Sequence, residues 1–315
     1  MKRFFSLLLA ALFLTACLSG CAQRREDRED GTLQVVSTIF ASYDFLRELL
    51  TGVPAEITLL LPPGTEVHSY EPSARDVIRI QNCDLFVYVG GENEVWVEKI
   101  LASLPEPIPT LRLLDCVDPV EEEPVGEHAH AHDHEEGDGG EWDEHVWTSP
   151  VNAVEIVQAL AEELCRIDDS HARQIRLNSE DYQQKLWQLD ERIRTIVAAA
   201  KNHILIFADR FPARYFVEEY GLHYYAAFPG CSADTEPSAA TVAALQDKIL
   251  ELSVPAIFHT ELSSEELCNT LCADTGVQKL LFHSCHNISL KEYQEGATYL
   301  SLMEQNARAI EFALN

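Results

Sequence analysis

Residues 33–61 read LQVVSTIFASYDFLRELLTGVPAEITLLL, and this stretch indicates the fold. A run rich in β-branched and apolar residues over 33–39 predicts a strand. Apolar residues at helical spacing over 42–50 predict a helix, which a glycine and a proline then end. Residues 56–61 are mostly apolar again and predict a second strand. Two short apolar strands joined by one helix are typical of a parallel βαβ unit.

The same alternation continues on both sides of a long helical pattern. Before it, we expect helices over 73–81, 95–104 and 151–166 and strands over 84–89 and 110–114. After it, we expect strands over 203–208, 223–227, 256–259 and 279–283 and helices over 214–220, 238–252, 265–275 and 293–313. The long pattern, over 170–201, predicts one helix of about 45 Å. The expected fold is therefore α/β, with two lobes that contain parallel sheets and a long rigid helix that joins them.

These elements divide the chain into segments. We expect a signal peptide over residues 1–20, a tether over 21–31, an N-terminal α/β lobe over 32–169, a linking helix over 170–201 and a C-terminal α/β lobe over 202–315. Residues 120–144, inside the first lobe, have no hydrophobic periodicity and are dominated by Glu, Asp, His and Gly. This composition predicts a mobile acidic loop.

The N-terminus has the pattern of a bacterial export signal. Lys2 and Arg3 precede an apolar stretch that is too short to serve comfortably as a permanent transmembrane helix. The stretch ends in LSGC, which resembles the lipobox in which a cysteine is lipid-modified, so we expect the lipid on Cys21. The sequence LTAC makes Cys17 the alternative. The expected location is the outer face of the cytoplasmic membrane, at the cell surface or in the periplasm, with a flexible charged tether after the lipid.

Composition narrows the possible partners. The chain has 23 basic and 52 acidic residues and a formal net charge of −29, which argues against a nucleic-acid partner and favours cations. Export would place the cysteines after the signal in a compartment where disulfides persist. These cysteines are residues 83, 116, 165, 231, 268, 272 and 285. Their number is odd, so at least one thiol is free, and the sequence does not give the pairing.

The acidic loop contains a histidine tract. His128, His130, His132 and His134 alternate with other residues, and carboxylates surround them. Imidazole binds zinc, copper and nickel, and the neighbouring carboxylates raise the local cation concentration. A flexible tract offers no rigid geometry, so we expect a weak and promiscuous metal site there.

Two other histidines lie where a loop leads into a helix. His68 follows the strand predicted over 56–61, and His145 comes just before the helix predicted over 151–166. Ligand sites in parallel α/β sheets lie at the carboxyl ends of the strands, where such loops meet. We therefore expect both side chains to be metal ligands.

The sequences around these histidines resemble a known family. PPGTEVHSYEPSARDV (62–77) and DEHVWTSPVNA (143–153) are similar to the first and second metal-ligand loops of the cluster A-I substrate-binding proteins of ABC transporters for zinc and manganese. The lipobox, the His-rich acidic loop and the long central helix match as well, so the resemblance covers essentially the whole chain. It implies two (β/α) domains joined by a rigid helix, with one metal ion in the cleft between them.

The second lobe departs from the family at the third ligand. The family usually has a histidine there, after a strand and before a segment that ends in Tyr-Gly-Leu. This chain has ILIFADRFP (204–212) before its Tyr-Gly-Leu, and alignment places Ala208 or Arg210 at the ligand position. Neither can bind Zn²⁺. Asp209 between them could supply a carboxylate, or could equally pair with Arg210 or with a helix N-terminus.

The fourth family ligand, a carboxylate after another strand, matches Glu261. His259, His283 and His286 are alternatives in the same half of the chain. We rank them below Glu261 because a strand histidine that points into the fold is usually a hydrogen-bonded core residue. Two histidines with carboxylates would still make a plausible zinc site.

These features predict a monomeric, lipid-anchored receptor that captures Zn²⁺ and delivers it to an ABC permease. The sequence has no GxxxxGK[ST], so ATP hydrolysis would belong to a partner. Manganese or iron is the alternative ligand, although imidazoles favour zinc. A surface adhesin tethered through the metal is a third possibility, and it would differ only in its partner.

A zinc hydrolase is the alternative from another class. Glu66 or Glu144 could act as its general base, since each lies close in sequence to a proposed ligand. The sequence contains neither HExxH nor GxSxG, however, so we expect no enzyme.

Overall fold

The computed structural model describes residues 31–66, 70–122, 142–230 and 237–315. Apart from residues 31 and 32, these belong to one compact unit, Leu33–Asn315, which contains every element below. Several features expected from the sequence lie outside the described residues: the signal peptide, Cys17, Cys21, most of the tether, His68, the tract His128, His130, His132 and His134, and Cys231.

The first lobe contains a parallel sheet with the strand order β2-β1-β3-β4. Its strands are β1 (Leu33–Ser37), β2 (Ala55–Leu59), β3 (Leu85–Tyr88) and β4 (Thr110–Arg112), and its helices are α2 (Phe40–Leu49), α3 (Ala74–Asn82) and α4 (Val95–Ser103). Helix α3 begins at a capping box, in which the Ser73 hydroxyl accepts from the Asp76 N–H and the Asp76 carboxylate accepts from the Ser73 N–H.

The second lobe repeats this topology with the strand order β6-β5-β7-β8, also parallel. Its strands are β5 (Ile204–Arg210), β6 (His223–Phe228), β7 (Ala256–Thr260) and β8 (Gln278–Phe282), and its helices are α7 (Arg214–Tyr220), α8 (Ala239–Leu252), α9 (Glu266–Thr275), α10 (Leu290–Glu295) and α11 (Tyr299–Ala313). The chain order reverses between β5 and β7, so the ends of these strands form a switch point at the carboxyl edge of the sheet. Arg210 and Glu261 lie there.

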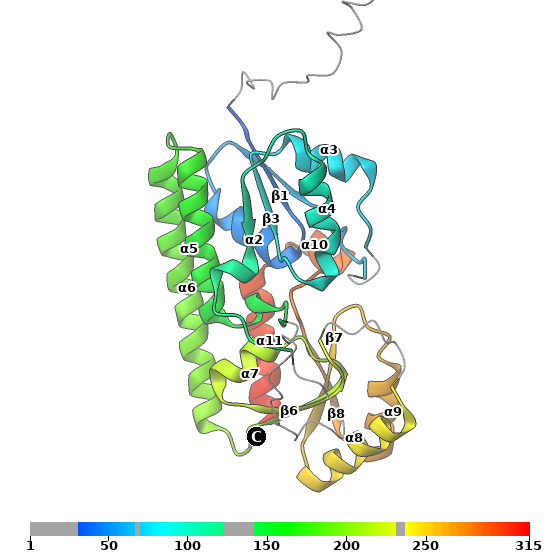
Figure 1. The fold of residues 1–315 in the computed structure, drawn as a ribbon. Helices are drawn as coiled ribbons and strands as arrows, with labels where there is room; N and C mark the ends of the chain where they lie inside the picture. The colour runs from blue at the N-terminus through cyan, green and yellow to red at the C-terminus, as the bar shows by residue number, and fades with distance from the viewer. Residues whose placement is uncertain (1–30, 67–69, 123–141, 231–236) are drawn as a thin grey trace, which may run out of the picture. The chain divides into compact units, whose positions relative to one another are not determined.

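Helices α5 (Pro150–Ile167) and α6 (Ala172–Ala199) run side by side, and α6 continues beyond α5 to the second sheet (Figure 1). Helix α6 contacts α2 in the first lobe and α7 in the second. Helix α11 also packs against α6, and it contacts both α2 and β8. Where α11 begins, the Tyr299 backbone N–H donates to the buried Asp44 carboxylate (2.7 Å). The Tyr299 side-chain hydroxyl donates to the Trp147 carbonyl (2.7 Å). The two lobes are therefore joined by α6 and by α11.

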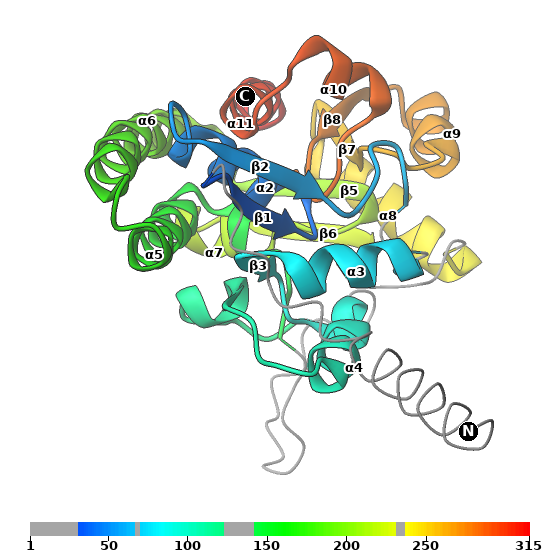
Figure 2. The same cartoon turned by 90° about the horizontal axis from the view of Figure 1, so that it is seen from above.

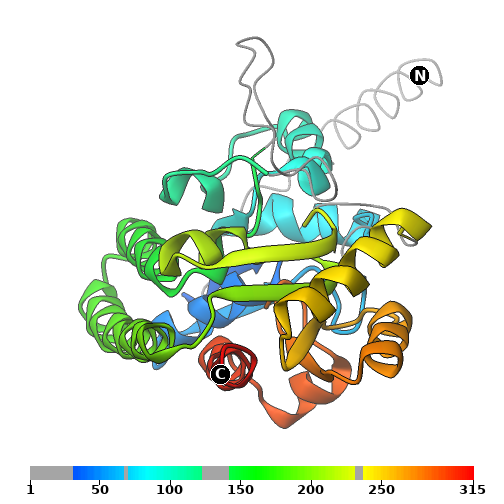
Figure 3. The ribbon, with the colours of Figure 1, turned by 90° about the horizontal axis from the view of Figure 1, so that it is seen from below.

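Alternate strand residues pack into different layers. In β1, Val35 belongs to an inner core with α2, α5 and α6, whereas Val36 packs with α3 and α4 on the other face (Figure 2). In β5, Phe207 joins the inner core and Ile206 packs with α8 and α9, which lie on the far side of the second sheet from α5 and α6 (Figure 3). The inner core includes residues of both lobes, so it is continuous between them.

The parallel sheets and the long helix expected from the sequence are present, and most element ends lie within two residues of the expected positions. One prediction is wrong: residues 293–313 do not form a single helix. Helix α10 ends at Gly296, whose φ of 75° is left-handed, and α11 begins afresh at a Thr298 capping box. The strand expected over 110–114 ends earlier, because Leu113–Cys116 form a 3₁₀ turn.

The six described cysteines are all free thiols: Cys83, Cys116, Cys165, Cys268, Cys272 and Cys285. Among the helices of the described residues, none combines the length and the apolar character that a membrane span requires.

Candidate metal site

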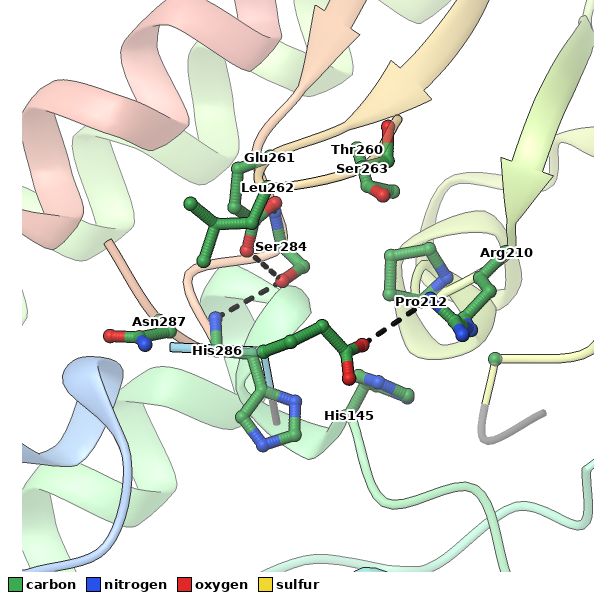
Figure 4. Close-up of a pocket in the computed structure, with 12 residues that line it drawn as sticks. His145, Arg210, Pro212, Thr260, Glu261, Leu262, Ser263, Ser284, His286 and Asn287 are labelled. Carbon is green, nitrogen blue, oxygen red and sulfur yellow. Dashed lines mark hydrogen bonds and ion pairs between the residues drawn. The ribbon is translucent and has the colours of Figure 1, made fainter. Parts of the chain in front are cut away.

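A cavity of about 60 Å³ lies where loops of the two lobes meet (Figure 4). The lining side chains that carry metal-binding or charged groups are Glu66, His145, Arg210, Glu261 and His286. Arg210 is the last residue of β5, and the other four side chains lie in loops after β2, β7 and β8 or just before the 3₁₀ turn Val146–Thr148. The cavity is therefore built at the ends of regular elements. This is the place that the parallel topology predicts for a ligand.

His145 is held by the acidic residue two positions before it. The ring is 3% exposed, and its Nδ1 donates to Asp143 Oδ1 at 3.1 Å. The same oxygen accepts from the His145 backbone N–H at 2.8 Å. Burial disfavours the charged ring, but the Asp143 carboxylate outweighs burial and raises the pKa of His145. With Nδ1 occupied, Nε2 is the nitrogen left for a metal ion, which is the usual arrangement for a metal-binding histidine.

Glu144 fixes the loop that carries His145. Its carboxylate oxygens accept from the Asn93 backbone N–H (2.9 Å) and from the Asn93 side chain (3.1 Å). The Glu144 carboxyl group occupies the space beside Gly91. A Cβ atom on residue 91 would lie 2.1 Å from the carboxyl carbon of Glu144. Any other residue at Gly91 would displace Glu144.

His286 lies opposite His145 in the cavity. The two rings are 5.6 Å apart between centroids and cross at 79°, and the His286 ring also stands edge-on to Trp147 at 5.0 Å. His286 is 6% exposed. Two imidazoles at this spacing can donate to one cation. The sequence ranked His286 below Glu261, and of the three alternative histidines named there, His286 is the one that lines the cavity.

The segment that carries His286, residues 284–288, is hydrogen-bonded to the first lobe. The Phe40 N–H donates to the His286 carbonyl (2.9 Å), and the Ala41 N–H donates to the Cys285 carbonyl (3.1 Å). We call residues 284–288 the strap. Its sequence belongs to the second lobe, but its backbone is fixed on α2 of the first.

Asn287 of the strap holds the loop that precedes His68. Its side-chain nitrogen donates to the Pro62 carbonyl (2.9 Å) and to the Thr65 carbonyl (2.7 Å). The Gly64 N–H donates to the Ile288 carbonyl (2.7 Å). The Asn287 side chain is almost fully buried, and its Oδ1 has no hydrogen-bond partner within the described structure. The strap therefore links the His286 region to the loop that leads towards His68.

Glu261 lines the cavity and is tied to the strap. Its Oε2 accepts from the Ser284 N–H at 2.7 Å, and its Oε1 accepts from the Ser284 hydroxyl (Figure 4). His283 lies behind it, with Nδ1 3.8 Å from Glu261 Oε1 and accepting from the Cys285 N–H. Glu261 is thus a positioned carboxylate whose oxygens each retain a further lone pair.

Asp209 and Arg210 have different environments, although they are neighbours at the end of β5. Asp209 Oδ2 accepts from the backbone and hydroxyl of Thr260 (both 2.9 Å), so it joins β5 to β7. Its Oδ1 accepts from the Arg210 N–H at 2.8 Å. Arg210, not Asp209, is among the residues that line the cavity. Ala208 is buried in the core beneath α8.

Within the described ranges, His, Cys, Asp and Glu form no cluster of three or more in an arrangement that could hold a metal ion. His145 and His286 therefore provide a pair of nitrogen donors, and any complete coordination shell needs further ligands.

The two parallel sheets have the same topology, and a long helix bridges them. A polar cavity that holds two imidazoles lies where the lobes meet. These features define the class as a two-lobed solute-binding protein. The model of one family, described as zinc-uptake complex component A, periplasmic, matches residues 35–313. The chain belongs to this family, and both the resemblance and the two-lobed α/β fold expected from the sequence are confirmed.

Two curated relatives have similar levels of identity. The zinc-binding lipoprotein AdcA of Streptococcus pneumoniae (strain ATCC BAA-255 / R6) is 33% identical over 315 residues, which are 98% of this chain and 60% of the relative. The high-affinity zinc uptake system protein ZnuA of Bacillus subtilis (strain 168) is 30% identical over 312 residues, which are 97% of this chain and 96% of the relative. The chain thus spans 60% of the length of the pneumococcal relative but nearly all of the Bacillus one.

Solved structures show the same fold. The Zn(II)-bound ZnuA-like domain of Streptococcus pneumoniae AdcA superposes with a TM-score of 0.73 at 30% identity, covering 90% of this chain and 99% of that one. The metal-dependent lipoprotein YcdH of Bacillus subtilis superposes with a TM-score of 0.74 at 28% identity, covering 90% of this chain and 100% of that one.

Proposed function

We propose that this protein is an extracytoplasmic receptor that captures Zn²⁺ and delivers it to an ABC permease and its ATPase. The observation that carries the proposal is the pair of buried rings, His145 and His286, facing each other in the cavity between the lobes. Family membership supports it, because curated relatives are named for zinc binding and zinc uptake. Imidazole pairs favour zinc over manganese, which prefers oxygen ligands.

The proposed ligands are His68 and His145 from the first lobe, His286 from the strap, and Glu261, which follows β7. Glu261 is proposed because its sequence matches the fourth family ligand. His286 is proposed because it lies opposite His145 in the cavity. Asp209 was proposed from the sequence as a further carboxylate, and its three hydrogen bonds favour a supporting role at the strand ends. The tract His128, His130, His132 and His134 is proposed as a weak collecting site.

The proposal contains no catalytic step, and it anchors the protein to the membrane by a lipid on Cys21, or on Cys17 as the alternative. Named relatives include lipoproteins. Replacing each cysteine by Ser in cells and following membrane attachment separates the two positions, since the modified residue alone should be needed for attachment.

Metal analysis of the purified chain, with zinc and manganese in competition, tests the proposal. We expect the wild type to retain one zinc ion tightly and to exclude manganese. His145→Ala and His286→Ala should each lose most of the tight binding, because each removes a directional bond to the metal. His171→Ala is the matched control, since His171 pairs with Asp168 at the start of α6. Retention of tight zinc by both cavity variants would contradict the proposed site.

A further inference from the structure

Helix α9 carries two cysteines that face the core of the second lobe. Of the six described cysteines, only Cys268 and Cys272 lie four residues apart in one helix. Residues at this spacing share one face of a helix, with Cβ atoms about 5–6 Å apart. Cys268 is fully buried in the core between α8, α9 and the sheet, and Cys272 packs against the same core from a partly buried position. The two thiols therefore form a pair beneath α9, with Cys272 the more exposed member.

The spacing of this pair favours a bridging metal ion over a disulfide. The two thiols interact, because burial, and then the charge of Cys272 and a hydrogen bond with it, raise the pKa of Cys268. A disulfide needs Cβ atoms about 3.8 Å apart, which is closer than two positions one turn apart in a regular helix. An ion between the sulfurs lengthens the link, so α9 can hold it without distortion. Zinc takes four ligands in most protein sites, whereas Cu⁺ is selected by soft thiolates and is stable between two of them.

Lys279 of β8 places a positive charge beside the pair. Its Nζ donates to Asn269 Oδ1 (2.7 Å) and to the Glu265 carboxylate, at the start of α9. Burial raises the pKa of both cysteine thiols, and the nearby ammonium acts in the opposite direction. A metal-bound cysteine is a thiolate, so two of them around one monovalent ion form an anionic complex. The ammonium stabilises such a complex for the same reason that it stabilises each thiolate.

We propose that Cys268 and Cys272 form a second metal site, separate from the zinc cavity, for the monovalent thiophilic ion Cu⁺. Two thiols and one Cu⁺ give a bis-thiolate complex of charge −1 and two protons, which go to the solvent. No electron is transferred, because copper enters as Cu⁺. The ion reaches the site by local opening of α9 on the side of Cys272. Neither cysteine lines the zinc cavity, so the chain sorts the two metals by donor type, with thiolates for copper and imidazoles for zinc.

The test is a titration of the reduced, zinc-loaded full chain with Cu⁺ in the absence of oxygen, with bathocuproine disulfonate as the competing chelator. The wild type should retain one more copper equivalent than either Cys268→Ala or Cys272→Ser. Lys279→Met should bind that equivalent about tenfold to a hundredfold more weakly, and Lys279→Arg should keep the affinity because it keeps the charge. Cys165→Ser is the matched control, since Cys165 is a partly buried thiol and the only cysteine of α5.

Two further readouts separate loss of the site from loss of the fold. X-ray absorption at the copper edge should show two sulfur neighbours in the wild type, and Cys272→Ser should bind zinc as tightly as the wild type. Equal copper retention by the wild type and both cysteine variants of α9 would overturn the proposal. Loss of the same equivalent in Cys165→Ser would also overturn it, because copper would then bind thiols without preference for the pair. A disulfide between Cys268 and Cys272, found by mass spectrometry of the isolated chain, would contradict the argument from spacing.

Discussion

Asp143 and Glu144 precede His145 directly, and their buried carboxylates have separate partners. Asp143 accepts from both the ring and the backbone of His145, so it sets the orientation of the imidazole. Glu144 accepts twice from Asn93, so it joins the His145 loop to the turn after β3. A general base needs an oxygen free to take a proton from water. The structure uses Glu144 as an anchor, which argues against Glu144 as the general base of the hydrolase alternative.

Asp143 should control how well His145 binds metal. Asp143→Asn replaces the negative acceptor by a neutral amide, and we expect zinc affinity to fall about tenfold to a hundredfold. The pKa of His145 should also fall, because the carboxylate is what overcomes burial and raises it. Zinc competition titration and a pH titration of the ring by NMR measure these two effects.

The control for this change is Asp168→Asn, which removes an acidic partner of another histidine, His171, at 2.6 Å. It should leave zinc affinity unchanged. If Asp143→Asn and Asp168→Asn bound zinc equally well, Asp143 would have no role in orienting the ligand.

Glu94 should make the stability of the protein depend on pH. It is buried, with 7% of its surface exposed, and its Oε2 accepts from the Val89 and Gly90 N–H groups. Burial raises its pKa to about 7. Between its ordinary pKa near 4.5 and about 7, the folded state holds a proton that the unfolded state has lost. The free energy of unfolding should therefore decrease as pH rises through this window. Above about pH 7 it should stay at this lower value, because Glu94 is then ionised in both states.

Glu94→Gln keeps an oxygen for the two backbone N–H groups and removes the titration. Relative to this variant, the wild type should lose about 3 kcal/mol of stability between pH 4.5 and pH 8. Urea unfolding of both proteins across this range measures the difference. A constant difference would show that folding leaves the pKa of Glu94 unchanged.

At the scale of elements, the strap (residues 284–288) holds His286 on the first lobe. Hydrogen bonds to Phe40, Ala41 and Gly64 fix its backbone on the first lobe, and the Trp147 indole N–H donates to the Ser284 carbonyl (2.7 Å). His286 is thus held on the same framework as His145. The pair is positioned before a metal arrives, which lowers the cost of ordering the site.

Asn287 tests this role of the strap. Asn287→Ala removes both hydrogen bonds to the Pro62 and Thr65 carbonyls, which should lower the free energy of unfolding by about 1–3 kcal/mol. Because that loop leads to His68, zinc affinity should fall as well. Thermal unfolding and zinc titration measure the two effects.

Asn269→Ala is the matched control, because Asn269 lies on α9 and accepts from Lys279. It should leave zinc affinity intact. Wild-type affinity in a destabilised but folded Asn287→Ala variant would show that the strap supports the fold without shaping the site.

The sequence predicts what depends on local pattern and leaves out what depends on distant contacts. The strands and the long helix were found because apolar periodicity and Gly or Pro breaks are local signals. The position of His145 at the cavity could be predicted because its loop leads directly into a helix. The position of His286 could not, because it depends on the strap, where Asn287 and Pro62 are 225 residues apart in sequence. The break at Gly296 was missed because one glycine in a helical pattern does not by itself end a helix.

At the scale of the whole unit Leu33–Asn315, the lobes share one inner core. Tyr182 of α6 packs against Phe45 of the first lobe, and Phe45 also stacks edge-on with Tyr299 at the start of α11. In the second lobe, Phe282 of β8 joins the same core. Moving one lobe as a rigid body would disturb this packing and the strap together. We therefore expect metal entry to involve the loops at the cavity more than rotation of the lobes.

Deleting the acidic loop tests the whole unit, because the deletion distinguishes a site that collects metal ions from a site that holds one tightly. The loop leaves the first lobe at a paired stem, where the Asp143 N–H donates to the Val120 carbonyl (2.9 Å) and Glu121 pairs with Trp142. Its ends are already close, so deleting residues 127–140 should preserve the fold. Ordering a loop around a metal costs about 1–2 kcal/mol per residue fixed, whereas the cavity imidazoles are already positioned.

Calorimetry of the deletion variant should therefore show one tight zinc site, with the additional weak sites lost. Zinc uptake by cells should decline mainly when zinc is scarce, since capture then limits the rate. The net charge of −29 still attracts cations to the whole surface, so high salt should reduce the contribution of the loop as it screens the carboxylates. If the tight site disappeared with the loop while His145→Ala retained it, zinc would be held by the tract and the cavity would have another ligand.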